Sequence, residues 1–276
     1  MTDVGTGEDL VVERAAAVAV ITLNRPRNRN ALTAHLIRSL RAAMADADAD
    51  DTVGAVILTG TDPAFCAGLD LGEVADTGEN LRLAEADGDP TAPPVGHPWT
   101  PLGKPVIGAI NGVAITGGFE LALHCDILIA SENAAFADTH VRVGVLPGWG
   151  MSVLLPRAVG AGRALRMSLT GEFLDAAAAL RYGLVTEVVP HAGLLAAAHR
   201  VAHGVLGADP ATCAAYLASV RRIADLDTGD AFRAEAEAAR NWLDRSFDPA
   251  GVASRRAGIV AGNRGALAEK PAAPAP

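Results

Sequence analysis

The sequence predicts an α/β core followed by a helical C-terminal region. Short apolar runs typical of buried strands, such as GAVILTG at residues 54–60, alternate with stretches of helical periodicity as far as about residue 190. From about residue 192 to residue 262 the pattern is helical, with breaks at Asp-Pro pairs and clustered aspartates. A chain of 276 residues is long enough to bury a substantial core in one large domain, with or without a helical appendage.

The composition is typical of a globular protein whose core consists of small aliphatic side chains, because aromatic residues make up only 4% of the chain. The formal net charge of −9 argues against a general affinity for nucleic acid, although a local group of arginines can still hold an anionic ligand. No apolar run reaches the ~18 residues of a membrane span. The polar, acidic start MTDVGTGEDL lacks the features of a signal peptide, so we expect a cytoplasmic protein.

The three cysteines, Cys66, Cys125 and Cys213, are widely spaced and form no CxxC pair. Since their number is also odd, the sequence predicts neither a disulfide framework nor a zinc site. We expect reduced, packed thiols.

The first predicted elements form a hairpin and a helix. Residues 1–8 are expected to be flexible, and residues 10–13 and 18–23 have the β-branched content of paired strands. Thr33 is a candidate N-cap for a helix that ends near residue 46.

Buried strands and a variable loop follow. The apolar runs at 54–60 and 105–110 are typical of strands covered on both faces. Residues 76–101 are rich in Asp, Glu, Gly and Pro, which predicts a loop over the site. The remaining predicted elements are a strand at 126–130, helices near 151–159, 163–169 and 175–182, a strand at 183–190, helices over 191–262 and a disordered Pro/Ala tail at 263–276.

The stretch KPVIGAINGVAITGGFELALHCD at 104–126 carries the clearest chemistry. Its pattern predicts a buried strand, a glycine turn and a helix. Gly117 and Gly118 permit close approach of a ligand, and the first N–H groups of the helix have no intrahelical partner, which suits an oxygen that gains negative charge. Glu120 lies one turn into this helix among apolar residues, where an unpaired carboxylate is costly. It is therefore a candidate acid or base.

A second turn of the same kind follows the strand at 54–60 and contains Gly68. Two such turns on neighbouring strands would aim two N–H groups at one oxygen. Arg25, Arg27 and Arg29 crowd the turn after residue 23, either as a solvated basic loop or as contacts to the phosphates of a ligand.

Three segments together resemble the crotonase family, also called the enoyl-CoA hydratase/isomerase superfamily. They are AFCAGLDL at 64–71, the stretch at 104–126 and VGVLPGWG at 143–150, and LNRPRNRNAL at 23–32 and LTGEFLDAAAALRYGLVTEVVP at 169–190 extend the resemblance. It covers about residues 12–190, and the C-terminus fits in type more than in motif. The resemblance implies a ClpP/crotonase-like fold of stacked β-β-α units over residues 9–190, with a helical trimerisation region at 191–262.

The resemblance also implies a binding site. In this family two backbone N–H groups hold the thioester oxygen of an acyl-CoA, and Leu69 and Gly117 match those positions. The residues that match the family's CoA- and substrate-binding regions are Arg25, Arg29, Ala67, Gly68, Asp70, Leu71 and Gly118.

Glu120 matches one of two glutamates that hold a water and move protons in the family's hydratases. When FADTHVRVGVLPG at 136–148 is aligned with the family's F-G-x-P-E-x-x-x-G-x-x-P-G, His140 stands at the second glutamate and Thr139 at the usual proline. A histidine titrates near neutrality and can exchange a proton there, or it marks a different or lost activity. Asp138 is a candidate partner for the imidazole.

The predicted reaction is hydration of a 2-enoyl-CoA to a 3-hydroxyacyl-CoA through an enolate, with Glu120 as base and His140 as proton donor. The alternatives are another reaction of the family (isomerisation, thioester hydrolysis or decarboxylation) and a non-catalytic acyl-CoA-binding protein. We expect no metal or redox cofactor, because the CoA thioester itself activates the substrate, and a homotrimer or homohexamer.

Overall fold

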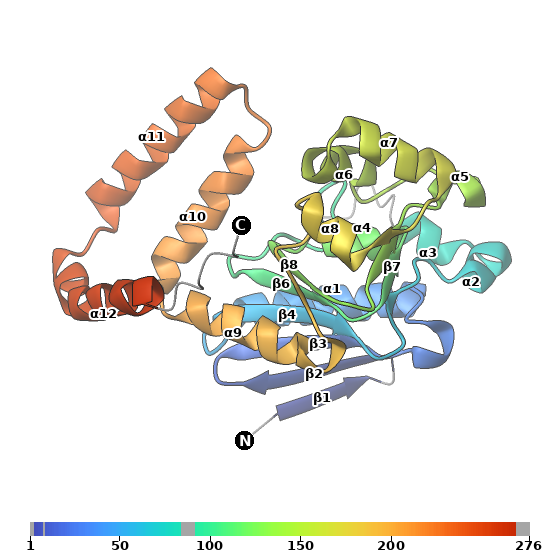
Figure 1. Ribbon diagram of the computed structural model, residues 1–276, viewed down its shortest axis with the longest axis horizontal. Coiled ribbons are helices and arrows are strands. Elements are labelled where there is room, and N and C mark those ends of the chain that lie inside the picture. Colours follow the sequence, from blue (N-terminus) through green and yellow to red (C-terminus); the bar gives the residue numbers. More distant parts are fainter. Residues whose placement is uncertain (1–2, 8, 84–91, 269–276) are drawn as a thin grey trace, which may run out of the picture. The chain divides into compact units, whose positions relative to one another are not determined.

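Seven strands form the main sheet of the computed structural model, which describes residues 3–7, 9–83 and 92–268 (Figure 1). In spatial order they are β1 (Asp3–Gly7), β2 (Leu10–Ala15), β3 (Val18–Leu23), β4 (Ala55–Gly60), β6 (Val106–Ile110), β8 (Ile127–Ser131) and β11 (Glu187–Val189). The first three strands pair antiparallel, and the pairs from β3 to β11 are parallel. Every residue of β4 and β6 is buried, as expected of parallel strands covered on both faces.

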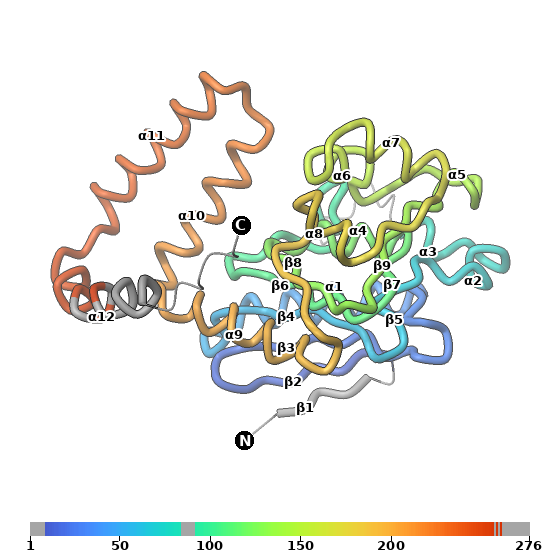
Figure 2. Tube along the Cα trace, in the orientation of Figure 1, coloured from blue at the N-terminus to red at the C-terminus, as the bar shows by residue number. Residues whose placement is uncertain are grey.

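A smaller sheet lies at the ends of the parallel strands. Its order is β10 (Leu174–Asp175), β9 (Ala135–Ala137), β7 (Val113–Ile115) and β5 (Ala64–Cys66). Figure 2 shows β5, β7 and β9 side by side, each continuing from a strand of the main sheet. The apolar pattern alone did not reveal these strands, because two or three residues are too few to show a period, and only the family resemblance implied a second strand in each unit.

Helices complete the units. They are α1 (Ala34–Ala49), α2 (Leu71–Asp76), α3 (Glu79–Arg82), α4 (Gly117–Leu123), α5 (His140–Val143), α6 (Met151–Val159), α7 (Ala161–Thr170), α8 (Ala176–Arg181), α9 (Leu194–Leu206), α10 (Pro210–Ile223), α11 (Thr228–Arg245) and α12 (Pro249–Ala268), with short 3-10 turns at Pro26–Asn28 and His191–Gly193. The successions β4-β5-α2, β6-β7-α4 and β8-β9-α5 confirm the predicted stacked β-β-α units. Thr33 caps α1, since its side chain accepts a hydrogen bond from the N–H of Leu36.

The two faces of the main sheet have separate apolar cores. Ala55 and Ile57 of β4 face α9, where they pack with Ala198 and Ala202. Val56 and Leu58, the alternate residues, belong to the larger cluster that also includes α1, α4 and α6. The alternation explains why a strand that is apolar on both faces except for Thr59, whose hydroxyl donates to the carbonyl of Ala109, is stable here.

The boundaries differ from the prediction in three places. Residues 3–7 were expected to be flexible, but they form β1, which pairs antiparallel with β2. This pairing provides hydrogen-bond partners for the backbone groups at the edge of β2. The compact unit that contains the main sheet extends beyond the predicted boundary at residue 190 to Leu217, because α9 packs against the sheet. Residues 218–276 form a second unit. α12 continues to Ala268, into the expected tail, and the rest of that tail lies outside the described residues.

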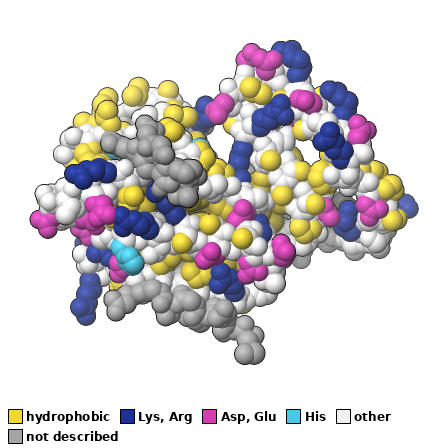
Figure 3. All heavy atoms as spheres, turned by 180° about the vertical axis from the view of Figure 1, so that it is seen from behind, with side chains coloured by type: hydrophobic (Ala, Val, Ile, Leu, Met, Phe, Trp, Pro, Cys, Tyr) yellow, Lys and Arg dark blue, Asp and Glu magenta, His cyan; other side chains and the backbone are white. Residues whose placement is uncertain are grey.

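Further expectations concern the loop before β6, the cysteines and membrane spans. The loop at 76–101 contains α3, and its residues 84–91 lie outside the described part of the chain. Figure 3 shows basic and acidic side chains interspersed with hydrophobic ones. Cys66, Cys125 and Cys213 are free thiols. Among the described residues, no helix combines the length and the apolarity that a membrane span needs.

Gly118 should tolerate no side chain, because a Cβ built there would lie 2.2 Å from the carbonyl oxygen of Cys66. Gly118→Ala is therefore expected to lower the free energy of unfolding by about 1–3 kcal/mol. The matched control is Gly204→Ala in α9, where an added Cβ meets nothing within 4 Å and a helical alanine should stabilise by about 0.5–1 kcal/mol. Urea unfolding of the three proteins measures both effects, and equal stability of Gly118→Ala and wild type would contradict the close approach.

Candidate active site

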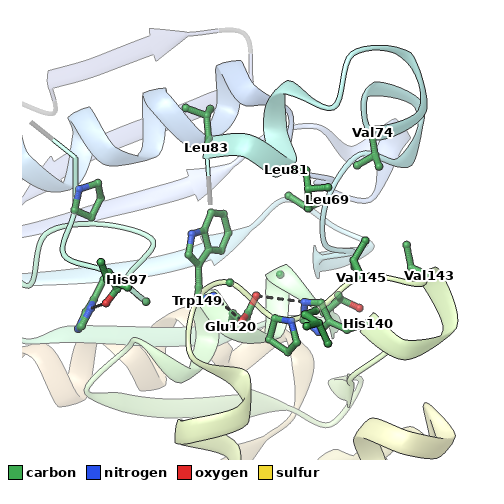
Figure 4. A pocket seen from close by; sticks show the side chains of 18 of the residues that line it. Leu69, Val74, Leu81, Leu83, His97, Glu120, His140, Val143, Val145 and Trp149 are labelled. Carbon is green, nitrogen blue, oxygen red and sulfur yellow. Dashed lines mark hydrogen bonds and ion pairs between the residues drawn. The ribbon is translucent and has the colours of Figure 1, made fainter. Parts of the chain in front are cut away.

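A cavity of about 720 Å³ opens beside α4 (Figure 4). Residues from all three β-β-α units contribute to its wall, together with 92–97 from the loop before β6. The wall includes Ala67, Leu69, Leu71, Thr116, Gly117, Glu120, Thr139, His140 and Trp149. Apolar side chains such as Leu81, Leu83 and Val145 cover much of the remaining wall, which Arg41 and His97 also line.

The N–H groups of Leu69 and Gly117 are both available in this cavity. Leu69 forms an isolated parallel β-bridge with Leu32. In this bridge the N–H of Leu32 donates to the carbonyl of Gly68, and the N–H of Asp70 donates to the carbonyl of Leu32. The N–H of Leu69 itself therefore points the other way, and it has no hydrogen-bond partner among the described residues. Gly117 is the first residue of α4, where an N–H has no intrahelical partner. The two segments touch, since a Cβ on Gly68 would lie 3.4 Å from the nitrogen of Gly117.

Thr116, directly before Gly117, has a strained backbone. Its φ of 52° and ψ of −115° belong to a region that favours glycine, and a β-branched residue there costs about 1–3 kcal/mol. Its hydroxyl lies 2.5 Å from that of Thr139, and its own N–H donates to the carbonyl of Ala137. Sequence reasoning did not single out Thr116, and no local pattern in the sequence signals this conformation.

Two backbone donors hold the buried carboxylate of Glu120. Oε1 accepts the N–H groups of Trp149 (2.9 Å), which precedes α6, and of Met151 (3.2 Å), the first residue of α6. Glu120 is only 2% exposed, so these bonds replace the hydration that burial removes. Oε2 remains directed at the cavity and at His140, as Figure 4 shows.

His140 lies between two acidic side chains. Its Nε2 is 3.6 Å from Oε2 of Glu120, and its Nδ1 is 2.6 Å from Oδ1 of Asp138. Asp138 also accepts the backbone N–H of His140, so the carboxylate fixes both the ring and the main chain. The structure thus brings together Glu120 and His140, and it turns Asp138 inward, which the sequence alone did not settle.

Electrostatics keeps His140 protonated at neutral pH. Burial of the ring opposes its positive charge, but the hydrogen bond to Asp138 and the adjacent Glu120 more than offset this and raise the pKa of His140 to about 9. Burial also works against the charge of Asp138, yet hydrogen bonds from His140 and Ser168 hold the pKa of Asp138 below its usual range. The cavity therefore presents an imidazolium N–H at Nε2.

The residues expected to contact CoA divide into two groups. Ala67 and Leu71 line the cavity with Leu69, whereas Arg25, Arg29, Gly68, Asp70 and Gly118 are not among the residues of its wall. Arg25 pairs with Asp70 (3.0 Å) and with Asp9 (3.5 Å), and Asp70 also caps α2. These two side chains hold the turn after β5 in place, a role that arises because segments 45 residues apart in the sequence meet.

Arg29 is exposed at the rim of this turn. Its carbonyl accepts the N–H of Ala67 (3.0 Å), so its side chain is attached close to the cavity wall. In the described part of the chain, no group of three or more His, Cys, Asp or Glu residues is arranged to hold a metal ion.

Known proteins that are similar to this chain carry the name enoyl-CoA hydratase. A protein from Arabidopsis thaliana named "Probable enoyl-CoA hydratase 1, peroxisomal" is 40% identical over 232 residues, which are 84% of this chain and 85% of the relative. The "Short-chain-enoyl-CoA hydratase" of Clostridium acetobutylicum is 35% identical over 233 residues, 83% of this chain and 87% of the relative. A crystal structure of an enoyl-CoA hydratase from Mycobacterium smegmatis superposes with a TM-score of 0.71 at 52% identity, covering 87% of this chain and 100% of that chain.

The family model described as Enoyl-CoA hydratase/isomerase matches residues 13–247. This range includes both glycine turns, the paired N–H groups and the Glu120–His140 pair. On this match the chain belongs to the enoyl-CoA hydratase/isomerase family, as the motifs at 64–71 and 104–126 predicted.

Proposed function

We propose that this protein hydrates a 2-enoyl-CoA to a 3-hydroxyacyl-CoA. The observation that carries the proposal is the pair formed by Oε2 of Glu120 and Nε2 of His140, 3.6 Å apart in a cavity that also exposes two backbone N–H groups. A single water at hydrogen-bond distance from both side chains fits such a separation. The thioester oxygen accepts the N–H groups of Leu69 and Gly117.

The reaction follows from these positions. Oε2 of Glu120 removes a proton from the water as its oxygen bonds to Cβ of the substrate, and the electron pair of the Cα=Cβ bond moves to the thioester oxygen. The two N–H groups stabilise the enolate, and losing one such donor typically costs about 3 kcal/mol. The Nε2–H of His140 then protonates Cα. The proton held by Glu120 passes to His140 across the 3.6 Å between them and restores both groups.

The protonation of His140 favours hydration over the other reactions of the family. Double-bond isomerisation would use the residue at this position as a base, and a base must be unprotonated. With its pKa raised to about 9, His140 is an acid at neutral pH. Turnover of a panel of enoyl-CoA thioesters separates the alternatives: hydration supports this proposal, another product supports a different family reaction, and binding without turnover supports a non-catalytic acyl-CoA-binding protein.

The CoA moiety is proposed to leave the cavity past Ala67 and Leu71. Arg29 is the better candidate for a phosphate contact, because it is exposed beside Ala67 and Arg25 is already paired with Asp70 and Asp9. No metal or redox group takes part in the proposed steps.

Glu120→Gln tests the general base. The amide keeps an oxygen for the N–H groups of Trp149 and Met151 but cannot take a proton, so kcat should fall about 10²–10⁴-fold while acyl-CoA binding stays within about twofold. Glu172→Gln, which alters an exposed ion pair with Arg166, is the matched control. Steady-state hydration of 2-butenoyl-CoA and calorimetric binding of butanoyl-CoA provide the readouts. A wild-type rate in Glu120→Gln would end the assignment.

The pH profile tests the proton donor. Because the reaction needs the imidazolium and the pKa of His140 is raised to about 9, kcat should fall as pH rises through about 9. Asp138→Asn removes one of the groups that raise this pKa, so the falling limb should move to lower pH. Folding must be followed in parallel by circular dichroism, since a group with a raised pKa also stabilises the fold less as pH rises from about 6.5 through 9. A flat profile to pH 10 would contradict the role of His140.

We further propose a homotrimer or homohexamer assembled through the C-terminal helices. Exposed apolar side chains on this part of the chain support it, including Leu226, Phe232, Leu243, Phe247 and Val252. Sedimentation equilibrium should give three or six times the mass of 28.2 kDa, and Phe232→Asp should shift the mass toward the monomer. A monomeric wild type at micromolar concentration would contradict this proposal.

A further inference from the structure

The conformation of Thr116 needs support from outside its own residue. A φ of 52° is accessible to glycine without strain, but a β-branched side chain populates it only when its surroundings fix it. The peptide between Thr116 and Gly117 matters most, because it carries the N–H of Gly117 at one end. At its other end the carbonyl of Thr116 accepts the N–H of Glu120 (2.9 Å).

One neighbouring segment provides that support. Thr116 N–H donates to the carbonyl of Ala137 (2.9 Å), and Thr116 Oγ1 accepts the N–H of Thr139 (3.2 Å). The two hydroxyl oxygens lie 2.5 Å apart, which is a short hydrogen bond between Thr116 and Thr139. Three hydrogen bonds from residues 137–139 therefore hold both the backbone and the side chain of Thr116.

The opposite side of the turn is closed by Gly68. A Cβ on Gly68 would lie 2.8 Å from the carbonyl oxygen of Ile115 and 3.3 Å from Cβ of Thr116. The strained residue is thus held between the glycine of the first unit and the threonine of the third. The backbone of Gly68 therefore packs closely against Ile115 and Thr116 on this side.

We propose that the hydroxyl pair of Thr116 and Thr139 is a positioning device that keeps the N–H of Gly117 directed into the cavity. Thr139 precedes His140, so the same pair fixes the oxyanion donor relative to the proton donor. These two groups act on adjacent substrate atoms, the thioester carbonyl and Cα, and a misplacement of about 1 Å between them is enough to slow a reaction. The inference rests on the proposed function only in treating Gly117 as a donor to the thioester oxygen.

Thr139→Val tests the device by removing the hydroxyl while keeping the shape of the side chain. It should lower kcat for 2-butenoyl-CoA about tenfold and leave the binding of butanoyl-CoA within about twofold, because a displaced oxyanion donor loses part of the 10²–10³ that a deleted one loses. Thr139→Ser restores the hydroxyl and should recover the wild-type rate. Thr59→Val is the matched control, since it removes a buried hydroxyl that donates to Ala109 and does not line the cavity.

A spectroscopic readout separates this inference from the proposed reaction. The carbonyl stretch of ¹³C-labelled butanoyl-CoA, followed by difference infrared spectroscopy, reports hydrogen bonding to the thioester oxygen without any turnover. Wild type, Thr139→Ser and Thr59→Val should lower its frequency equally, and Thr139→Val should lower it less. A protein that shifts the carbonyl but hydrates no enoyl-CoA would overturn the proposed function and leave this inference standing.

A double-mutant cycle decides whether Thr139 acts through its hydrogen bond to Thr116. In a Thr116→Gly background the partner hydroxyl is absent and the turn is unstrained, so adding Thr139→Val should change neither kcat nor the carbonyl frequency. The inference is overturned if Thr139→Val has the same effect in both backgrounds, if it has no effect on wild type, or if the wild-type protein does not shift the carbonyl at all. Thermal unfolding of each variant by circular dichroism identifies any loss that comes from misfolding.

Discussion

Burial of the Glu120 carboxylate is the constraint on which the site depends. At 2% exposure this group is stable only with hydrogen bonds in place of water, and the N–H groups of Trp149 and Met151 supply them. The chain after the third unit must therefore return to α4 before α6 begins. The same return closes one wall of the cavity, so the residues that stabilise the buried acid also shape the space in front of it.

Much of the site follows from local spacing, and that part could be predicted. Gly117 and Glu120 lie three residues apart at a helix start, and the resemblance to the family's motif placed His140 at the position of the second glutamate. The inward direction of Asp138 and the two amides that hold Glu120 had no signal, because a backbone donor looks the same at every residue. The pairing of Arg25 with Asp70 also had no signal, because it emerges only when distant segments meet.

The fold was predictable to a similar degree and for similar reasons. The apolar run of β4 is typical of a buried strand and the helix after Thr33 has a cap and a helical period, and the structure has both where expected. The strands β5, β7 and β9 have three residues each, too few for a pattern, and they are fixed by pairing with one another. The edge strand β1 likewise depends on a partner and not on its own sequence.

In the parallel register of β4 and β6, Ile57 lies beside Ile107. This register also determines the relative position of the two backbone N–H groups in the cavity. Leu69 is carried by the chain that leaves β4, and Gly117 by the chain that leaves β6. A slip of one residue in the pairing of β4 with β6 would move one of these N–H groups by about 3.3 Å relative to the other, which is more than the length of a hydrogen bond. It would also turn the buried side chains of β4 to the opposite faces of the sheet, which the two cores forbid. The apolar core is therefore the part of the molecule that sets the accuracy with which an oxyanion is held.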